Sequence, residues 1–323
     1  MSELIPFSEA IKVERLDSHT YKVNLIDSYC IGTVPNGGYT ASCLLEAARL
    51  HLPKQPDPMT AHFQFLNRTE VGPAIIVISD VKPGRQFSML HLTLYQRGLL
   101  SEAPWITDGS TRTEITAYLT ATDLSKENGL NLPTFWESTY ASFDPKPLAP
   151  PPADFSLLKE NKDPNWTKLE YGKGPGGTYA RVLQNCDLYF PKAGQPHQSV
   201  IDVWMRLNVG GEKFTNSSLG FVSDAFPYVV ESYRPAEGNK PFGSREMFWY
   251  PTVVMSLELK RTLPTEGVEW LRLRMQTREI RNGRLDMEVV ILREGGELIG
   301  VSHQVNLVLG SERNTSGREK GNI

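Results

Sequence analysis

Apolar and polar residues alternate along several segments of the chain, and this period of two predicts β-strands with one buried face. Residues 11–26 alternate around an Asp-Ser-His turn, which predicts a hairpin. Four more segments predict long strands in the first half of the chain: 58–66, 74–81, 84–98 and 113–124. We expect these segments to form a strongly curved antiparallel sheet.

One segment of the first half has a helical period instead. Ala41, Leu44, Leu45 and Ala48 recur at i, i+3, i+4 and i+7, which predicts a helix with one apolar face. The helix follows a Pro-Asn-Gly-Gly turn, and Pro53 closes it. It is the only helix of real length that the first half predicts.

The same order of elements returns in the second half. Predicted strands lie at 177–190, 197–207, 252–262, 270–280, 285–292 and 298–309, with a helical segment at 218–233. In addition, a Gly-Arg pair introduces a long strand in each half, at 84–85 and at 283–284. The repeated order predicts an internal duplication.

A proline-rich segment containing "PKPLAPPPADF" separates the two halves, and such composition is typical of a semi-rigid tether rather than core. The predicted organisation is a first domain at 1–125, a linker at 126–165, a second domain at 166–310 and a disordered polar tail at 311–323. The predicted fold class is α+β. It has two curved antiparallel sheets, each wrapped round a central helix, joined into one pseudo-dimer.

Composition and charge narrow the classes of function. A net charge of -3 and a pI near 6.1, with no basic cluster among aromatic residues, argue against a nucleic-acid partner. Cys30, Cys43 and Cys186 are too scattered for a disulfide framework or a CxxC zinc site. No apolar run reaches the roughly 18 residues that span a bilayer. We therefore expect a cytoplasmic protein without a membrane partner, metal or other cofactor.

Five motifs occur in the order and near the spacing of one known family: "PNGGYTASCLLEAA", "AHFQFLNRTEVGP", "VKPGRQFSMLHLTLYQRG", "FVSDAFPY" and "LIGVSHQ". In these motifs the chain resembles the acyl-CoA thioesterase II family. The resemblance implies a double hotdog fold and hydrolysis of an acyl-CoA or carrier-bound acyl thioester to free acid and thiol. It also implies that an Asp, a Thr and a Gln hold and activate a water, and these match Asp224, Thr252 and Gln304.

Thioester hydrolysis suits these residue types. Asp224 can act as general base, and its apolar neighbours are expected to raise its pKa from about 3.9 by desolvation. Thr252 and Gln304 can fix the water without competing for its proton. Gly37 and Gly38 at the start of a helix can present backbone N–H groups to the thioester oxygen. The reverse arrangement, in which the loop before Asp224 supplies the N–H groups that bind the thioester oxygen, stays open.

Aromatic residues near these motifs predict an apolar substrate channel. The candidates for its wall are Trp105, Phe226, Phe248 and Trp249. His62 lies in "DPMTAH", which has the Asp-x4-His spacing of hotdog hydratases. Because His62 alternates with apolar neighbours inside a predicted strand, we interpret it as a structural or substrate-wall residue.

Other interpretations fit the same residues. Asn-Gly-Gly before a helix is typical of a turn that caps the helix. Side chains alternate between the two faces of a strand, and this alternation would place Thr252 and Gln304 on the solvent face. Glu46 is interpreted as an ion-pair partner of Arg49 at i+3. The cavity could also catalyse an elimination, isomerisation or cyclisation of an acyl thioester, or a hydration that uses His62. It could also bind an acyl group without catalysing a reaction. Hotdog proteins commonly pair, so a homo-oligomer is compatible with the sequence.

Overall fold

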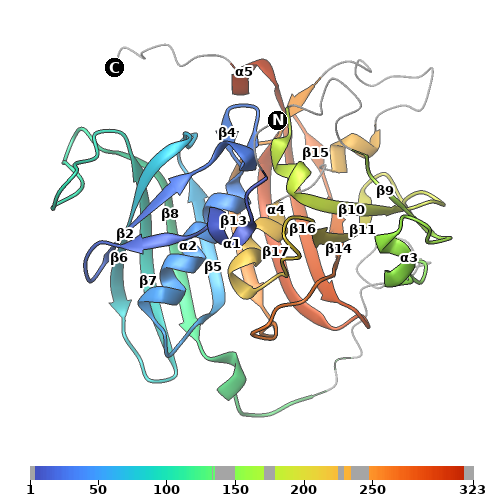
Figure 1. Cartoon of the computed structure of the whole chain (residues 1–323), viewed down its shortest axis with the longest axis horizontal. Helices are drawn as coiled ribbons and strands as arrows, with labels where there is room; N and C mark the ends of the chain where they lie inside the picture. The colour runs from blue at the N-terminus through green and yellow to red at the C-terminus, as the bar shows by residue number, and fades with distance from the viewer. Residues whose placement is uncertain are drawn as a thin grey trace.

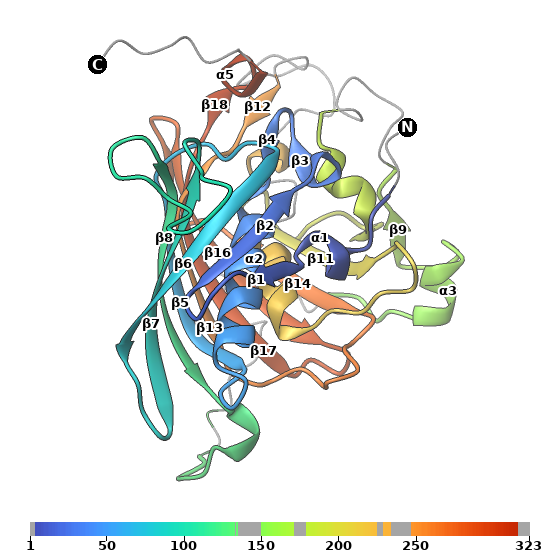
Figure 2. The ribbon, with the colours of Figure 1, turned by 60° about the vertical axis from the view of Figure 1, so that its left-hand side comes forward.

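A curved 14-stranded sheet runs through the molecule, and the central helices α2 and α4 pack against its inner side (Figures 1 and 2). The computed structural model describes residues 4–132, 134, 150–170, 179–224, 229–233 and 247–315. The helices are α1 Phe7–Ala10, η1 Asp27–Tyr29, α2 Gly37–His51, η2 Leu124–Lys126, α3 Phe155–Lys159, η4 Arg181–Asn185, η5 Asn216–Ser218, α4 Leu219–Asp224, η6 Val229–Tyr233 and α5 Glu312–Thr315. The strands of the first half are β1 Val13–Arg15, β2 Thr20–Leu25, β3 Cys30–Ile31, β4 Val34–Pro35, β5 Asp57–Phe65, β6 Gly72–Lys82, β7 Phe87–Gln96 and β8 Arg112–Thr122. Those of the second half are β9 Trp166–Lys168, β10 Cys186–Pro191, β11 Val200–Leu207, β12 Phe248–Trp249, β13 Thr252–Leu259, β14 Leu271–Gln276, β15 Ile280–Arg281, β16 Arg284–Arg293, β17 Leu298–Leu307 and β18 Leu309–Gly310.

The order of strands in the sheet carries the predicted duplication. The 14-stranded sheet runs β1-β2-β6-β7-β8-β5-β13-β17-β16-β14-β11-β10-β9, with β15 paired to β16. The two halves meet at a seam between β5 and β13. Outward from this seam, the strand order is β5-β8-β7-β6-β2 in the first half and β13-β17-β16-β14-β11 in the second. Each half therefore places the same successive elements at the same distance from the seam, and the predicted double hotdog fold is confirmed. The two predicted sheets are continuous, because β5 and β13 pair as antiparallel neighbours.

The two central helices lie side by side in the core. α2 has 15 residues, and its middle is fully buried. The second helical segment, predicted at 218–233, is α4 with only six residues, followed by the 3-10 turn η6. Residues 225–228 between them lie outside the described residues. Both described parts of the predicted segment are helical, the first as an α-helix and the last as a 3-10 helix.

The second part of the predicted linker packs against the protein. Leu158 and Trp166 are fully buried in a second apolar cluster with Tyr189, Trp204 and Trp270 of the C-terminal half. Leu158 and the partly buried Ala153 and Phe155 lie within the predicted linker, so the prediction of a tether outside any core was wrong for this part of it. Residues 135–149, which include the first five residues of the proline-rich motif, lie outside the described residues.

The beginning of the predicted disordered tail is also ordered. Residues 312–315 form α5, and Asn314 is fully buried. Its side chain accepts a hydrogen bond from the Thr33 N–H at 2.9 Å and donates to the Ile31 carbonyl at 2.8 Å. These bonds satisfy backbone groups of the β3–β4 turn, which explains why a polar segment docks there. Residues 316–323 lie outside the described residues.

Among the described helices, none combines the length and apolar character needed to cross a bilayer.

All three cysteines are unpaired and buried. Burial raises the pKa of the Cys30 thiol to about 12 and raises those of Cys43 and Cys186 as well. We expect the native protein to show no thiol that reacts with Ellman's reagent within minutes at pH 8, and three after unfolding in guanidinium chloride. A fast-reacting thiol in the native protein would contradict this burial.

Candidate active site

Asp224 is the last residue of α4 and points at the start of α2. The residue is only 3% exposed. Its Oδ2 accepts hydrogen bonds from the Gly38 N–H at 2.8 Å and the Asn36 Nδ2 at 3.1 Å, and its Oδ1 accepts one from the Thr252 hydroxyl at 2.8 Å. Desolvation favours the neutral acid, whereas three donors favour the carboxylate. The sequence predicts the desolvation, from the apolar neighbours of Asp224, but not the three hydrogen-bond donors.

Thr252 reaches Asp224 because of an irregularity at the start of β13. The pairing of β13 with β17 shifts register between Thr252 and Val254, after Thr252 has paired with Asn306. One extra residue reverses the alternation of faces, so Thr252 shares the inner face with Asn306 instead of the outer face with Ser256. A prediction from regular alternation along the strand therefore places Thr252 on the wrong face of the sheet.

Gln304 also faces inward and is 3% exposed, together with the fully buried Asn306. Its Nε2 donates to the Ser223 carbonyl at 2.6 Å, and its Oε1 accepts from the Asn306 Nδ2 at 3.2 Å. That Nδ2 also donates to the Thr252 hydroxyl at 2.7 Å. Asp224, Thr252 and Gln304 thus belong to one hydrogen-bond network, in which Asn306 connects Gln304 to the other two.

The N–H groups at the start of α2 have distinct partners. The Asn36 N–H donates to the Tyr29 carbonyl, the Gly38 N–H to Asp224, and the Tyr39 N–H to the Asn36 side chain, which is the helix cap. Among the described residues, no partner is found for the Gly37 N–H. The prediction that both glycines donate to a substrate is corrected for Gly38, because the Asp224 carboxylate occupies its amide.

A cavity of about 240 Å³ opens at this point. Asp224, Gly37 and Thr252 contribute to its wall, with Phe65, Arg68 and Trp249 around them. The Arg68 guanidinium lies 5.9 Å from the centre of the Trp249 ring. The cavity therefore combines a carboxylate, an available backbone donor, apolar rings and one cation.

The other candidates from the sequence fall into three groups. Trp249 lines the cavity, and Phe226 lies outside the described residues. His62 is exposed on the outer face of β5, where its Nδ1 lies 2.8 Å from the Ser256 hydroxyl oxygen, so the structure does not bring it to the site. Trp105 donates to the Asp17 carboxylate near the β1–β2 turn, so its predicted place in the channel wall was wrong, and Phe248 is not found among the cavity-lining residues that the structure describes.

Glu46 forms the predicted ion pair. Its carboxylate accepts two hydrogen bonds from the Arg49 guanidinium, at 2.8 and 2.6 Å, and a third from the Ser217 hydroxyl at 2.8 Å. Glu46 lies eight residues beyond Gly38 on α2 and faces the beginning of α4, at the opposite end of the helix pair from Asp224.

The duplication does not repeat the polar network. β5 has its own register shift, between Pro58 and Thr60, at the position equivalent to the shift in β13. By this correspondence Pro58 replaces Thr252, and the β8 residues Leu119 and Ala121 replace Gln304 and Asn306. A hydroxyl and two amides in one half correspond to three apolar side chains in the other. Only the second half therefore supplies strand side chains to the network around Asp224, and the first half contributes Asn36 and Gly38 from the start of α2.

The continuous sheet, the paired helices and the polar site at their end define a double hotdog protein. Residues 25–121 match the acyl-CoA thioesterase N-terminal domain, and residues 147–308 match the acyl-CoA thioesterase C-terminal domain. The chain is 42% identical to the thioesterase-like protein TwmA of Talaromyces wortmannii over 338 residues, covering 98% of this chain and 95% of TwmA. The chain belongs to the acyl-CoA thioesterase family.

Solved structures share the fold at lower identity. A hotdog-fold protein from Alicyclobacillus acidocaldarius aligns with a TM-score of 0.66 and 18% identity, over 94% of this chain and 97% of that one. The acyl-CoA thioesterase II TesB2 from Mycobacterium marinum aligns with a TM-score of 0.62 and 18% identity, over 94% and 98%. The match to the C-terminal domain begins within the predicted linker, as does the packed segment described above.

Proposed function

We propose that this protein hydrolyses an acyl thioester, carried by coenzyme A or by an acyl carrier protein, to the free acid and the thiol. The observation that carries the proposal is the buried Asp224 carboxylate, which lies beside the available Gly37 N–H in one cavity. A base and an oxyanion donor in close proximity are what acyl transfer to water requires.

In the proposed reaction, the thioester carbonyl oxygen accepts a hydrogen bond from the Gly37 N–H. Asp224 takes a proton from a water molecule as the water oxygen bonds to the carbonyl carbon. The tetrahedral intermediate places negative charge on the oxygen held by Gly37, at the positive end of α2. Collapse of the intermediate breaks the C–S bond, and the proton on Asp224 passes to the leaving sulfur. The carboxylic acid and the free thiol are released.

Thr252, Gln304 and Asn306 act in this proposal as positioning residues. The Thr252 hydroxyl donates to Asp224 and accepts from Asn306, so its proton is directed at the carboxylate and fixes the orientation of Asp224. Gln304 holds the Ser223 carbonyl, one residue before Asp224. The network therefore orients the base from two sides.

The direct test is a thiol-release assay over a series of acyl-CoA substrates, with acid and thiol both measured by mass spectrometry. We expect equal amounts of the two products and saturation with substrate. An elimination, isomerisation or cyclisation would change the acyl group without equimolar thiol, and a silent binding protein would release none. The burial of all three cysteines removes background from a colorimetric thiol readout.

Arg68 gives a test of how the substrate is delivered. Its half-buried guanidinium lies at the cavity wall and donates to the Arg313 carbonyl, and a guanidinium is a group that can also bind a phosphate of coenzyme A. We expect Arg68→Ala to raise KM for an acyl-CoA about 10-fold, as loss of one charge-assisted hydrogen bond does. KM for the matching N-acetylcysteamine thioester, which lacks phosphates, should stay unchanged. The control is Arg261→Ala, an exposed arginine paired with Glu297. An equal rise in KM for both thioesters would remove Arg68 from phosphate recognition.

A further inference from the structure

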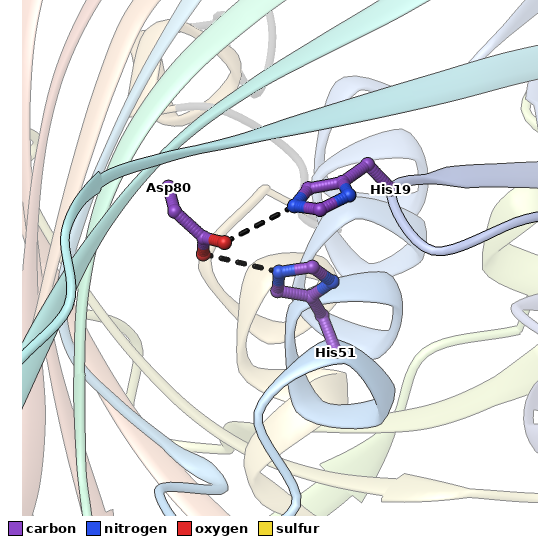
Figure 3. A group of neighbouring side chains, drawn as sticks. All are labelled: His19, His51 and Asp80. Carbon is purple, nitrogen blue, oxygen red and sulfur yellow. Dashed lines mark hydrogen bonds and ion pairs between the residues drawn. The ribbon is translucent and has the colours of Figure 1, made fainter.

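Two histidines and an aspartate from three separate elements converge at the far end of α2 (Figure 3). His19 comes from the β1–β2 turn, His51 is the last residue of α2, and Asp80 lies in β6. The Nε2 atoms of His19 and His51 each lie 3.1 Å from a different oxygen of Asp80. The three ligand atoms all lie within 4.8 Å of one another.

The opposite nitrogen of each imidazole ring has its own partner. The Nδ1 of His19 lies 2.8 Å from the Ser18 hydroxyl, and the Nδ1 of His51 lies 3.2 Å from the Tyr21 hydroxyl. A hydrogen bond at Nδ1 fixes the orientation of a ring and leaves Nε2 as the atom that faces inward. Metal-binding histidines are commonly held in this way by a partner on the second nitrogen.

We propose that His19, His51 and Asp80 form a binding site for a divalent transition metal ion, with Zn²⁺ as the representative ion. Two imidazole nitrogens and one carboxylate oxygen are a donor set that zinc accepts, with water in the fourth position. At zinc–ligand bonds of about 2.0–2.1 Å, neighbouring tetrahedral ligands are about 3.3 Å apart. Whichever Asp80 oxygen binds the ion, one histidine Nε2 lies 3.1 Å from it, close to this spacing. The three ligand atoms all lie within 4.8 Å of one another, so the side chains would move closer together around the ion.

The surroundings favour a cation with access to water. The side chain of His51 is 7% exposed, whereas those of His19 and Asp80 are 46% and 38% exposed, so an ion can enter from one side. The site also lies at the C-terminal end of α2, where the helix dipole stabilises positive charge. In the part of the chain that the structure describes, this is the only group of three such residues with converging ligand atoms.

The metal site is separate from the proposed active site. Gly37 and His51 are the first and last residues of α2, and at 1.5 Å per residue the two ends are about 21 Å apart. We therefore assign the ion a structural role: it would fasten the β1–β2 turn and the end of α2 to β6. Because a bound ion stabilises the folded state, its effect should be seen in thermal stability.

The test uses the full-length protein after treatment with EDTA, titrated with Zn²⁺ by calorimetry and, separately, with Co²⁺ by visible absorption. We expect one ion per chain and the absorption of four-coordinate Co²⁺. His19→Ala, His51→Ala and Asp80→Asn should each weaken Zn²⁺ binding by at least about 10- to 100-fold. Zn²⁺ at 100 times its Kd should raise Tm by about 3–6 °C in the wild type and not in these variants.

The matched controls are His62→Ala and His303→Ala, two exposed histidines on the outer face of the sheet, which should bind Zn²⁺ as the wild type does. His19 and Asp80 are partly exposed, so their variants keep the test available even if His51→Ala unfolds. Absence of stoichiometric binding in the wild type would overturn the proposal. Zn²⁺ binding that survives both His19→Ala and Asp80→Asn would overturn the proposal equally. The cluster would then only connect the β1–β2 turn, α2 and β6 by hydrogen bonds.

Discussion

Asp224→Asn is expected to lower kcat/KM for acyl thioester hydrolysis by at least about 10²-fold, the usual contribution of a general base. The amide has nearly the same shape as the carboxylate but cannot take a proton from water. Its oxygen can still accept from the Gly38 N–H, whereas its NH2 group faces the Thr252 hydroxyl and removes that donor's acceptor. We expect a stability loss of about 1–3 kcal/mol beside the loss of rate.

The measurement is kcat/KM together with Tm, because Asp224 also connects α4 to α2. Thr252→Ser should retain most activity since it keeps the hydroxyl, and Thr252→Val should lose about 10-fold or more by freeing the carboxylate. His62→Ala is the matched control, because His62 lies outside the cavity on the opposite face of the sheet. If Asp224→Asn lowers only Tm and leaves kcat/KM at the wild-type value, Asp224 is structural and the hydrolase mechanism fails.

Most of the fold could be predicted because its determinants are periodic. The strands β5, β6, β7 and β8 and their counterparts β13, β14, β16 and β17 all follow a local alternation that needs no knowledge of the partner strand. α2 was predictable for the same reason, from its apolar face and its Asn-Gly-Gly cap.

The candidate site was predictable only in part. Asp224, Thr252 and Gln304 follow from the family resemblance, and the structure joins them in one network. The inward direction of Thr252 depends on a register shift that is defined by β17, and the inward direction of Gln304 depends on which face of β17 meets the core. Asn36 and Asn306 complete the network, yet a polar residue in a turn or a strand has no distinctive local signal.

Long-range packing explains the remaining differences. Leu158 is an apolar residue in a segment of linker composition, and its cluster partners Trp204 and Trp270 lie far along the chain. The histidine–aspartate cluster likewise comes from a turn, a helix end and a strand that are well separated in sequence. No spacing rule connects such residues before the sheet brings them together.

Gly38→Ala is expected to destabilise the protein by about 2–3 kcal/mol, which is the usual cost of overpacking a rigid contact. A Cβ atom at Gly38 would lie 2.4 Å from the Gly220 carbonyl oxygen and 2.6 Å from the Asp224 Cβ. The first of these atoms is backbone, so α2 and α4 would have to separate. The better helix propensity of alanine offsets at most about 1 kcal/mol of this cost.

Gly37→Ala is the matched comparison, because its added Cβ would meet the Asp224 Oδ2 at 3.0 Å and the Phe65 ring at 3.3 Å, both on side chains that can shift. Urea unfolding should therefore give the lower stability for Gly38→Ala, while Gly37→Ala narrows the cavity and lowers activity with a smaller loss of stability. Equal stability of the two variants would mean that the helices are not in this close contact. The paired glycines would then be kept for their amides alone, whereas the structure gives them separate tasks: Gly37 faces the cavity, and Gly38 lets the helix carrying Asp224 approach.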